Sequence, residues 1–172
     1  EVAVAWGQFI AGTRPWSLFG GLTFDPSRHR NGFETVFGHK IPRGVSFEQA
    51  RRAWESVAKE LAQKLPRFEY VVAIEAHKNG SAHLHPLLYV GPLKGGEISL
   101  IGQEWYQRFG YSQLSKPRDS RAVSEYAAKY LAKDISAGTV LLSRGLASHL
   151  RLERVFGRSW RNAIGRIEKS WQ

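Results

Sequence analysis

Two apolar, β-rich segments separated by a short polar loop constrain the fold of this chain more than any other feature. They are residues 68–75 and 83–90, and the loop runs His77-Lys78-Asn79-Gly80-Ser81. Aromatic and β-branched residues in both segments, with a glycine in the loop, are typical of a β-hairpin. The chain is therefore expected to contain an antiparallel strand pair.

Further elements are predicted on both sides of this hairpin. Ser46 and Gln49 have the spacing of a capping box, apolar residues follow at helical spacing, and Pro66 stops the helix. The sequence also predicts strands over 18–24 and 111–114, a loop over 27–44, a short helix over 104–109 and a longer helix over 120–134. Helices and strands in this order predict an α+β fold rather than a doubly wound one.

The composition favours one domain with a polyanionic partner. A chain of 172 residues with 42% hydrophobic content is expected to form a single domain over 1–172. Its 25 Lys and Arg outnumber 15 Asp and Glu, which favours DNA or RNA, although an ordinary solvated basic surface is the alternative. The C-terminal region, about 135–172, is especially basic, with seven Lys or Arg against two Glu.

Two absences exclude several classes of function. The chain has no Cys, which excludes disulfides, thiolate zinc sites and cysteine nucleophiles and fits a cytoplasmic protein. It also has no apolar run of about 18 residues, so no membrane-spanning segment is expected.

The second segment of the hairpin carries two histidines. Alternation along a strand places His83 and His85 on the same face. Two imidazoles within an apolar run are costly unless they are hydrogen-bonded or bind a metal. The pattern therefore indicates either a metal site or a pair of satisfied histidines.

The register of the hairpin decides whether a carboxylate joins the two histidines. A three-residue loop with Gly80 in the left-handed conformation pairs Glu75 with His83 on one face, and His77 then lies on that face as a weaker candidate ligand. A two-residue Asn79-Gly80 turn instead turns Glu75 away. Only the first register gives a site of two histidines and one carboxylate, which suits Mg²⁺ or Mn²⁺ but also zinc or iron.

The predicted helix over 120–134 contains the pattern Y-x-x-K twice. Tyr126 and Tyr130 are four residues apart, as are Lys129 and Lys133, so each pair shares a helix face. A phenol with a pKa of about 10 is a weak nucleophile at neutral pH, and a neighbouring ammonium helps it to attack. The alternative is an amphipathic helix with packed tyrosines and solvated lysines.

Together these motifs resemble the HUH endonuclease superfamily, and in particular the initiators of rolling-circle replication. Gly21-Leu22-Thr23-Phe24 resembles the first motif, His83-Leu84-His85 the second, and Tyr126 to Lys133 the third, in the initiator order. The doubled tyrosine is similar to the phage-type members. The resemblance covers about residues 18–134.

The resemblance implies a five-stranded antiparallel sheet with flanking helices, related to the RNA-recognition fold. It implies that His83, His85 and Glu75 hold Mn²⁺ or Mg²⁺, and that Tyr126 or Tyr130 attacks single-stranded origin DNA to leave a 5′-phosphotyrosine. Lys129 or Lys133 would hold the phosphate or activate the phenol. Tyr126 is preferred here as the first nucleophile. A prokaryotic host would supply helicase and polymerase as partners.

Three alternatives remain at this point. A non-catalytic nucleic-acid-binding module of the RNA-recognition type would explain the charge and the sheet, but not the His pair or the doubled Y-x-x-K. An iron oxygenase uses the same ligand types. A transposase with HUH chemistry would differ in substrate and not in the first chemical step.

Overall fold

The computed structural model describes residues 2–28, 33–34, 40–41, 44–77, 80–134 and 140–149. Most of the basic C-terminal region therefore lies outside the described residues. In chain order the elements are α1 (Val2–Thr13), β1 (Leu18–Phe24), β2 (Phe33–Glu34), β3 (Lys40–Ile41), α2 (Phe47–Lys64), β4 (Glu69–Ala76), β5 (Ala82–Tyr89), α3 (Glu97–Arg108), β6 (Gly110–Ser115), α4 (Ser120–Asp134), β7 (Val140–Leu142) and α5 (Arg144–His149). None of the helices described is both long and apolar enough to span a membrane.

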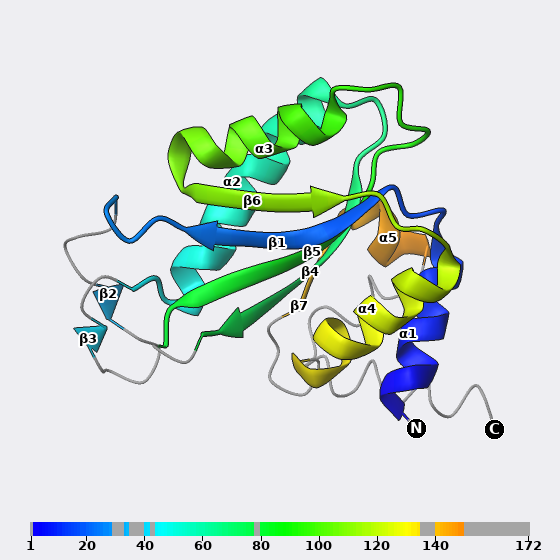
Figure 1. Cartoon of the computed structure of the whole chain (residues 1–172), viewed down its shortest axis with the longest axis horizontal. Coiled ribbons are helices and arrows are strands. Elements are labelled where there is room, and N and C mark those ends of the chain that lie inside the picture. Colours follow the sequence, from blue (N-terminus) through cyan, green and yellow to red (C-terminus); the bar gives the residue numbers. More distant parts are fainter. Residues whose placement is uncertain are drawn as a thin grey trace.

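The main sheet has five strands in the order β6-β1-β5-β4-β7, and each neighbouring pair is antiparallel (Figure 1). This confirms the expected α+β fold with a five-stranded antiparallel sheet and flanking helices. The segment expected to be a loop, 27–44, differs in one respect. Within it, β2 and β3 pair as a small separate ribbon.

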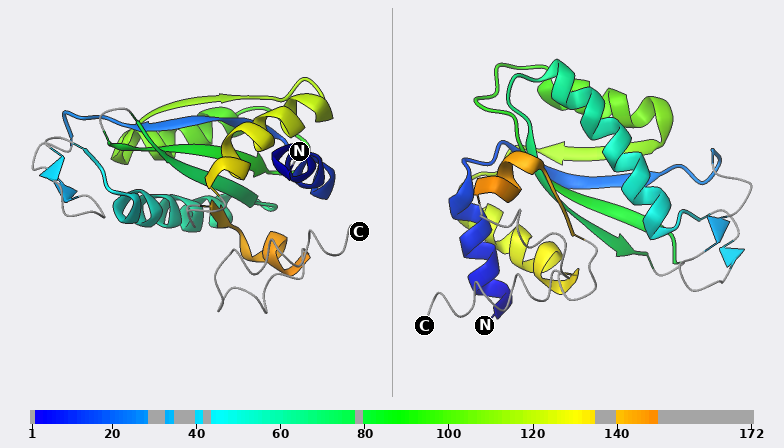
Figure 2. Two further views of the ribbon diagram at one scale, coloured as in Figure 1. Left: turned by 90° about the horizontal axis from the view of Figure 1, so that it is seen from below. Right: turned by 180° about the vertical axis from the view of Figure 1, so that it is seen from behind.

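Helices cover both faces of the sheet (Figure 2). On one face, α2 and α3 bury Trp54, Leu61 and Trp105 against strand residues that include Leu22 and Leu84. On the other face, α1 and α4 pack over the alternate strand residues, among them Ala73 and Leu87. Because side chains alternate along a strand, His83 and His85 belong to the α4 face.

Helix α2 confirms the predicted capping box. The Ser46 hydroxyl accepts from the amide N of Gln49 at 3.2 Å, and the Ser46 amide donates to the Gln49 side chain at 2.9 Å. The helix ends at Lys64, and Leu65 forms its C-cap just before Pro66. Capping at both ends fixes α2 across the sheet and so fixes the side on which the other face remains available.

The hairpin uses the register that the three-residue loop predicts. Glu75 pairs with His83, Gly80 has a φ of 82°, and the His77 amide donates to the Ser81 carbonyl at 2.8 Å. The alternative two-residue turn is therefore excluded. As a result, Glu75 and His83 lie side by side on the α4 face.

Helix α1 was not predicted from the sequence, and it contacts α4 closely through Gly7. A Cβ at Gly7 would lie 2.9 Å from the Cβ of Ala128 and closer still to the carbonyl O of Ser124. Only a residue without a side chain allows the two helices to approach this far. The contact therefore helps to fix the position of α4 over the sheet.

Gly7→Ala is expected to lower the free energy of unfolding by about 1–2 kcal/mol, because overpacking outweighs the gain in helix propensity. Gly12→Ala in the same helix is the matched control, since nothing lies within 4 Å of its added Cβ. That control is expected to stabilise by about 0.5–1 kcal/mol. Urea unfolding of both variants measures the difference, and equal stabilisation would contradict the close α1–α4 contact.

Candidate metal and tyrosine site

The register of the sheet assembles a row of side chains on the α4 face. Thr23 on β1 pairs with His83 on β5 and with Tyr111 on β6, and His83 pairs with Glu75 on β4. Four strands therefore contribute one residue each to the row. Two of the three predicted metal ligands, Glu75 and His83, are neighbours within it.

The predicted ligands lie in contact. Nε2 of His85 is 3.1 Å from Oε2 of Glu75, and the rings of His83 and His85 are 4.5 Å apart between centroids. The ring of His77 is also 4.5 Å from that of His83, as expected for the weaker candidate ligand. All four donor groups thus gather on one face of the β4–β5 hairpin.

Both histidines of the pair are neutral near pH 7. Burial lowers the pKa of His83 to about 4, and the neighbouring His85 and His77 add to this effect. Burial also lowers the pKa of His85 to about 4, although a hydrogen bond to the backbone of Gly20 opposes it. A neutral imidazole offers one ring nitrogen with a free electron pair, which is the form that binds metals.

The donor types fit a divalent cation, but their positions do not form a finished cage. Nδ1 of His83 is buried without a hydrogen-bond partner, so one ring nitrogen lacks the contact that burial normally requires. However, no group of three or more histidine or carboxylate side chains among the described residues is arranged to hold a metal ion. Binding an ion here therefore requires the side chains of the hairpin to adjust.

Tyr130 on α4 lies directly over the histidine pair. Its ring stacks on that of His85, with a centroid distance of 3.7 Å and an interplanar angle of 16°. Nζ of Lys129 is 4.6 Å from the Tyr130 ring centroid, and a side-chain hydrogen bond to Tyr130 raises the pKa of the Lys129 ammonium. A partly exposed phenol therefore has a permanent positive charge beside it.

Tyr126, one turn earlier, is placed differently. Its side chain is 9% exposed and belongs to the core beneath α4, where it packs edge-on against Phe19. Its hydroxyl donates to the carbonyl oxygens of Gly20 and Pro86, the latter at 3.3 Å. Burial raises the pKa of the Tyr126 phenol above its ordinary value, so this hydroxyl is held protonated.

The remaining predicted residues divide into two cases. Lys133 lies on α4, but the position of its side chain is outside the described residues. Gly21, from the first motif, lies against the histidines. A Cβ at this position would be only 3.2 Å from Nε2 of His83. The first motif thus provides the flat floor on which the His83 ring rests.

An open cavity of about 810 Å³ lies over this part of the sheet. His83, His85, Tyr126 and Tyr130 line it together with the β6 residues Tyr111 and Gln113. The β6 residues were not among the predicted site residues, because a short strand prediction does not indicate which strand will be its neighbour. Alternation along 111–115 was the available signal, since it places Tyr111 and Gln113 on one face.

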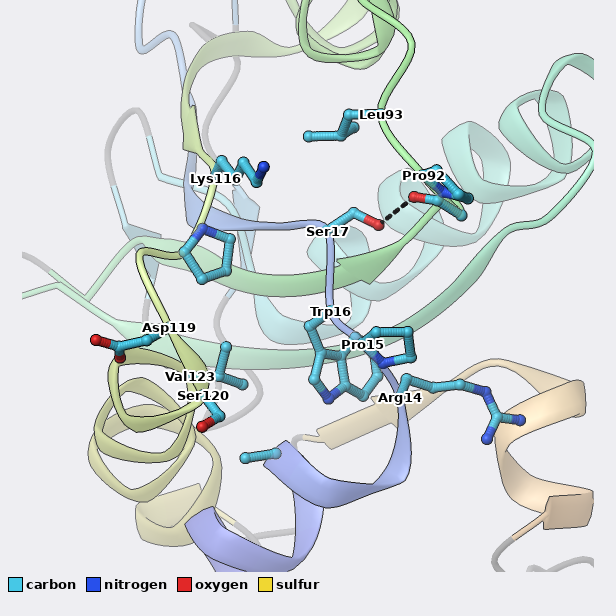
Figure 3. A pocket seen from close by; sticks show the side chains of 13 residues that line it. Arg14, Pro15, Trp16, Ser17, Pro92, Leu93, Lys116, Asp119, Ser120 and Val123 are labelled. Atoms are coloured by element: carbon cyan, nitrogen blue, oxygen red, sulfur yellow. Dashed lines mark hydrogen bonds between the residues drawn. The ribbon is translucent and has the colours of Figure 1, made fainter.

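A second cavity, of about 480 Å³, lies at the opposite end of β1 (Figure 3). Trp16, Pro92 and Val123 contribute apolar walls, and the Ser17 hydroxyl in it already donates to the Gly91 carbonyl at 2.8 Å (Figure 3). It contains none of the predicted site residues. The chemistry is therefore concentrated in the cavity beneath α4.

Fold and site together define an α+β protein whose antiparallel sheet presents two imidazoles and a carboxylate to a tyrosine-bearing helix. The family model for replication-associated proteins of the ORF2 type matches residues 17–135, which is more than half of the chain. The chain belongs to this family of replication-associated proteins. The matched segment extends from just before β1 to just beyond α4 and includes every predicted site residue. No curated protein and no solved structure matches the chain.

Proposed function

We propose that this protein initiates rolling-circle replication by nicking and joining single-stranded origin DNA through a 5′-phosphotyrosine. The observation that carries the proposal is the stacking of Tyr130 on His85, which in turn contacts Glu75 at 3.1 Å. A nucleophile and a candidate metal site thus share one cavity. Membership in a replication-associated family supports the same function.

The candidate metal ligands are His83, His85 and Glu75, and the ion is Mn²⁺ or Mg²⁺. When bound, the ion supplies Lewis acidity to a phosphate oxygen and orients the phosphate. The proton shared by His85 and Glu75 would leave on binding, because ligating groups must be deprotonated. The ring of Tyr130 holds the His85 imidazole in its plane and so limits how far the ligand can turn.

Tyr130 is the first nucleophile in this proposal. Its phenolic oxygen forms the new bond to phosphorus, and the bond from phosphorus to the 3′-oxygen of the preceding nucleotide breaks. One proton passes, in net terms, from the phenol to the departing 3′-hydroxyl. The Lys129 ammonium beside Tyr130 favours the phenolate and the added negative charge.

Tyr126 serves the second transfer. Its hydroxyl first has to leave the carbonyl oxygens of Gly20 and Pro86, which delays its reaction until the first cleavage is complete. The i, i+4 spacing then brings both hydroxyls to one helix face. This order differs from the preference for Tyr126 that the sequence suggested, and the reason is the buried hydrogen-bonded hydroxyl.

Glu75→Gln is expected to weaken Mn²⁺ binding by about tenfold or more, because an amide oxygen replaces an anionic ligand. Isothermal titration calorimetry with Mn²⁺ measures the change. Glu125→Gln is the matched control, since Glu125 pairs with Arg121 at 2.8 Å on the exposed side of α4. Unaltered Mn²⁺ affinity in Glu75→Gln would remove Glu75 from the ligand set.

The function itself is tested with single-stranded oligonucleotides that tile the DNA molecule encoding the chain. Incubation with Mn²⁺ should give a covalent protein–DNA band on a denaturing gel for one of them. EDTA should abolish the band, and added Mn²⁺ should restore it. A protein that binds these oligonucleotides and never forms the band would instead be the non-catalytic binding module.

A further inference from the structure

Two tyrosines near the β6 edge of the sheet are unusually exposed. Tyr106 at the end of α3 is 52% exposed, and Tyr111 at the start of β6 is 55% exposed. No other aromatic side chain for which the structure gives a burial is as open to solvent. Neither residue is needed for the core, so their exposure calls for another explanation.

Contacts hold the two rings in place. Their centroids are 6.2 Å apart, and the Arg28 guanidinium lies 4.8 Å from the Tyr106 ring centroid. Asp25, at the end of β1, is 3.4 Å from Nε of Arg28 and accepts from the Tyr111 hydroxyl at 3.5 Å. Tyr106, Tyr111 and Arg28 therefore form a preorganised aromatic and cationic ledge, called the Tyr111 ledge below.

The ledge is continuous with the candidate site. Tyr111 lines the same cavity as His83 and Tyr130, and it shares the row of the sheet in which Thr23 separates it from His83. Two strand spacings, roughly 10 Å, separate β6 from β5. Figure 1 shows β6 at the open edge of the sheet, with α3 along it and the end of β1 beside its start.

We propose that the Tyr111 ledge stacks a base of the single-stranded DNA next to the nucleotide whose phosphate is attacked. The inference rests on the proposed function and adds a base-binding position to the same cavity. An exposed aromatic face accepts any base, and a neighbouring guanidinium can contact the backbone phosphate. The net charge of +10 favours this occupant over an acidic or apolar protein surface.

The stacking is tested by binding, independently of cleavage. The parent protein is Tyr126→Phe/Tyr130→Phe, which keeps both rings and lacks both candidate nucleophiles. Fluorescence anisotropy with a labelled single-stranded oligonucleotide at low salt gives its affinity. Adding Tyr111→Ala should weaken binding by about tenfold or more, as expected for loss of one stacked base.

Two further variants separate stacking from general damage. Tyr111→Phe retains the ring and should recover most of the lost affinity. Ile98→Ala removes another exposed apolar side chain of the α3 region, 40% exposed, and should bind like the parent. A 2-aminopurine base, moved one position at a time through the oligonucleotide, should be quenched at adjacent positions by the parent and not by Tyr111→Ala.

The outcomes distinguish the ledge from the function on which it rests. If the parent binds single-stranded DNA and Tyr111→Ala binds equally well, the ledge is wrong and the proposed function is unaffected. If Tyr111→Phe is as weak as Tyr111→Ala, the hydroxyl contact to Asp25 and not stacking is responsible, and the inference is overturned. If the parent shows no affinity for single-stranded DNA, both the ledge and the proposed function fall.

Discussion

Tyr130→Phe is expected to reduce formation of the covalent protein–DNA product by roughly a thousandfold or more, as loss of a nucleophile does in other enzymes. The substitution removes only the hydroxyl, so the ring still stacks on His85 at the centroid distance of 3.7 Å seen in the native protein. Binding of single-stranded DNA and the unfolding midpoint should therefore change little. A denaturing gel measures the product.

Tyr126→Phe is the matched comparison, because it removes the other hydroxyl from the same helix. That hydroxyl donates to Gly20 and Pro86, so this variant should still form the first covalent product. It should fail to join a second cleaved end. If Tyr126→Phe loses the first product and Tyr130→Phe keeps it, the order of the two tyrosines is reversed.

His83→Ala and His85→Ala are each expected to abolish both Mn²⁺ binding and cleavage, because each removes one of only three candidate ligands. The loss in cleavage should be about a hundredfold or more. The main core on the α2 face does not include either histidine, so the fold should survive. Calorimetry with Mn²⁺ and far-ultraviolet circular dichroism test these two statements.

His77→Ala is the control for the histidine pair. The His77 ring is as close to His83 as His85 is, at 4.5 Å, but it is at the exposed end of the hairpin. Its removal is expected to have a smaller effect on Mn²⁺ affinity than either member of the pair. Full cleavage by His83→Ala in the presence of EDTA would show that the chemistry needs no metal at this position.

Local patterns were sufficient to predict the parts of the fold that short-range chemistry controls. The capping box at Ser46 and the left-handed glycine at Gly80 each fix a backbone geometry that only a few residues determine. The second of these selected the register that unites Glu75 and His83. For this reason the candidate ligand set followed from the sequence.

Two helices were harder to predict because their sequences depend on tertiary contacts. The α1 sequence is apolar on all sides, with Val2, Trp6 and Ile10 interspersed with alanines, so it shows no helical contrast. Helix α3 was predicted only over 104–109, whereas it begins at Glu97. Gly102 obscures its first half, and the structure gives the reason. A Cβ there would lie 2.9 Å from the Ser112 hydroxyl on β6.

The roles of the two tyrosines could not be separated from their sequence pattern. Both occur in the same Y-x-x-K spacing, so the motif treats Tyr126 and Tyr130 alike. The difference arises from Gly20 and Pro86, which are far away in the sequence and offer carbonyl oxygens to Tyr126 alone. The Tyr111 ledge is also a tertiary feature, because β1, α3 and β6 each contribute to it.

The central claim, transfer of a DNA 5′-phosphate to Tyr130, is tested most directly by the polarity of labelling. Oligonucleotides labelled at the 3′ end or the 5′ end are incubated with the protein and Mn²⁺, and the covalent band is digested and sequenced by mass spectrometry. We expect only the 3′ label to travel with the protein, on the peptide containing Tyr130. A band that carries the 5′ label, or an adduct that persists in Tyr126→Phe/Tyr130→Phe, would contradict the proposed chemistry.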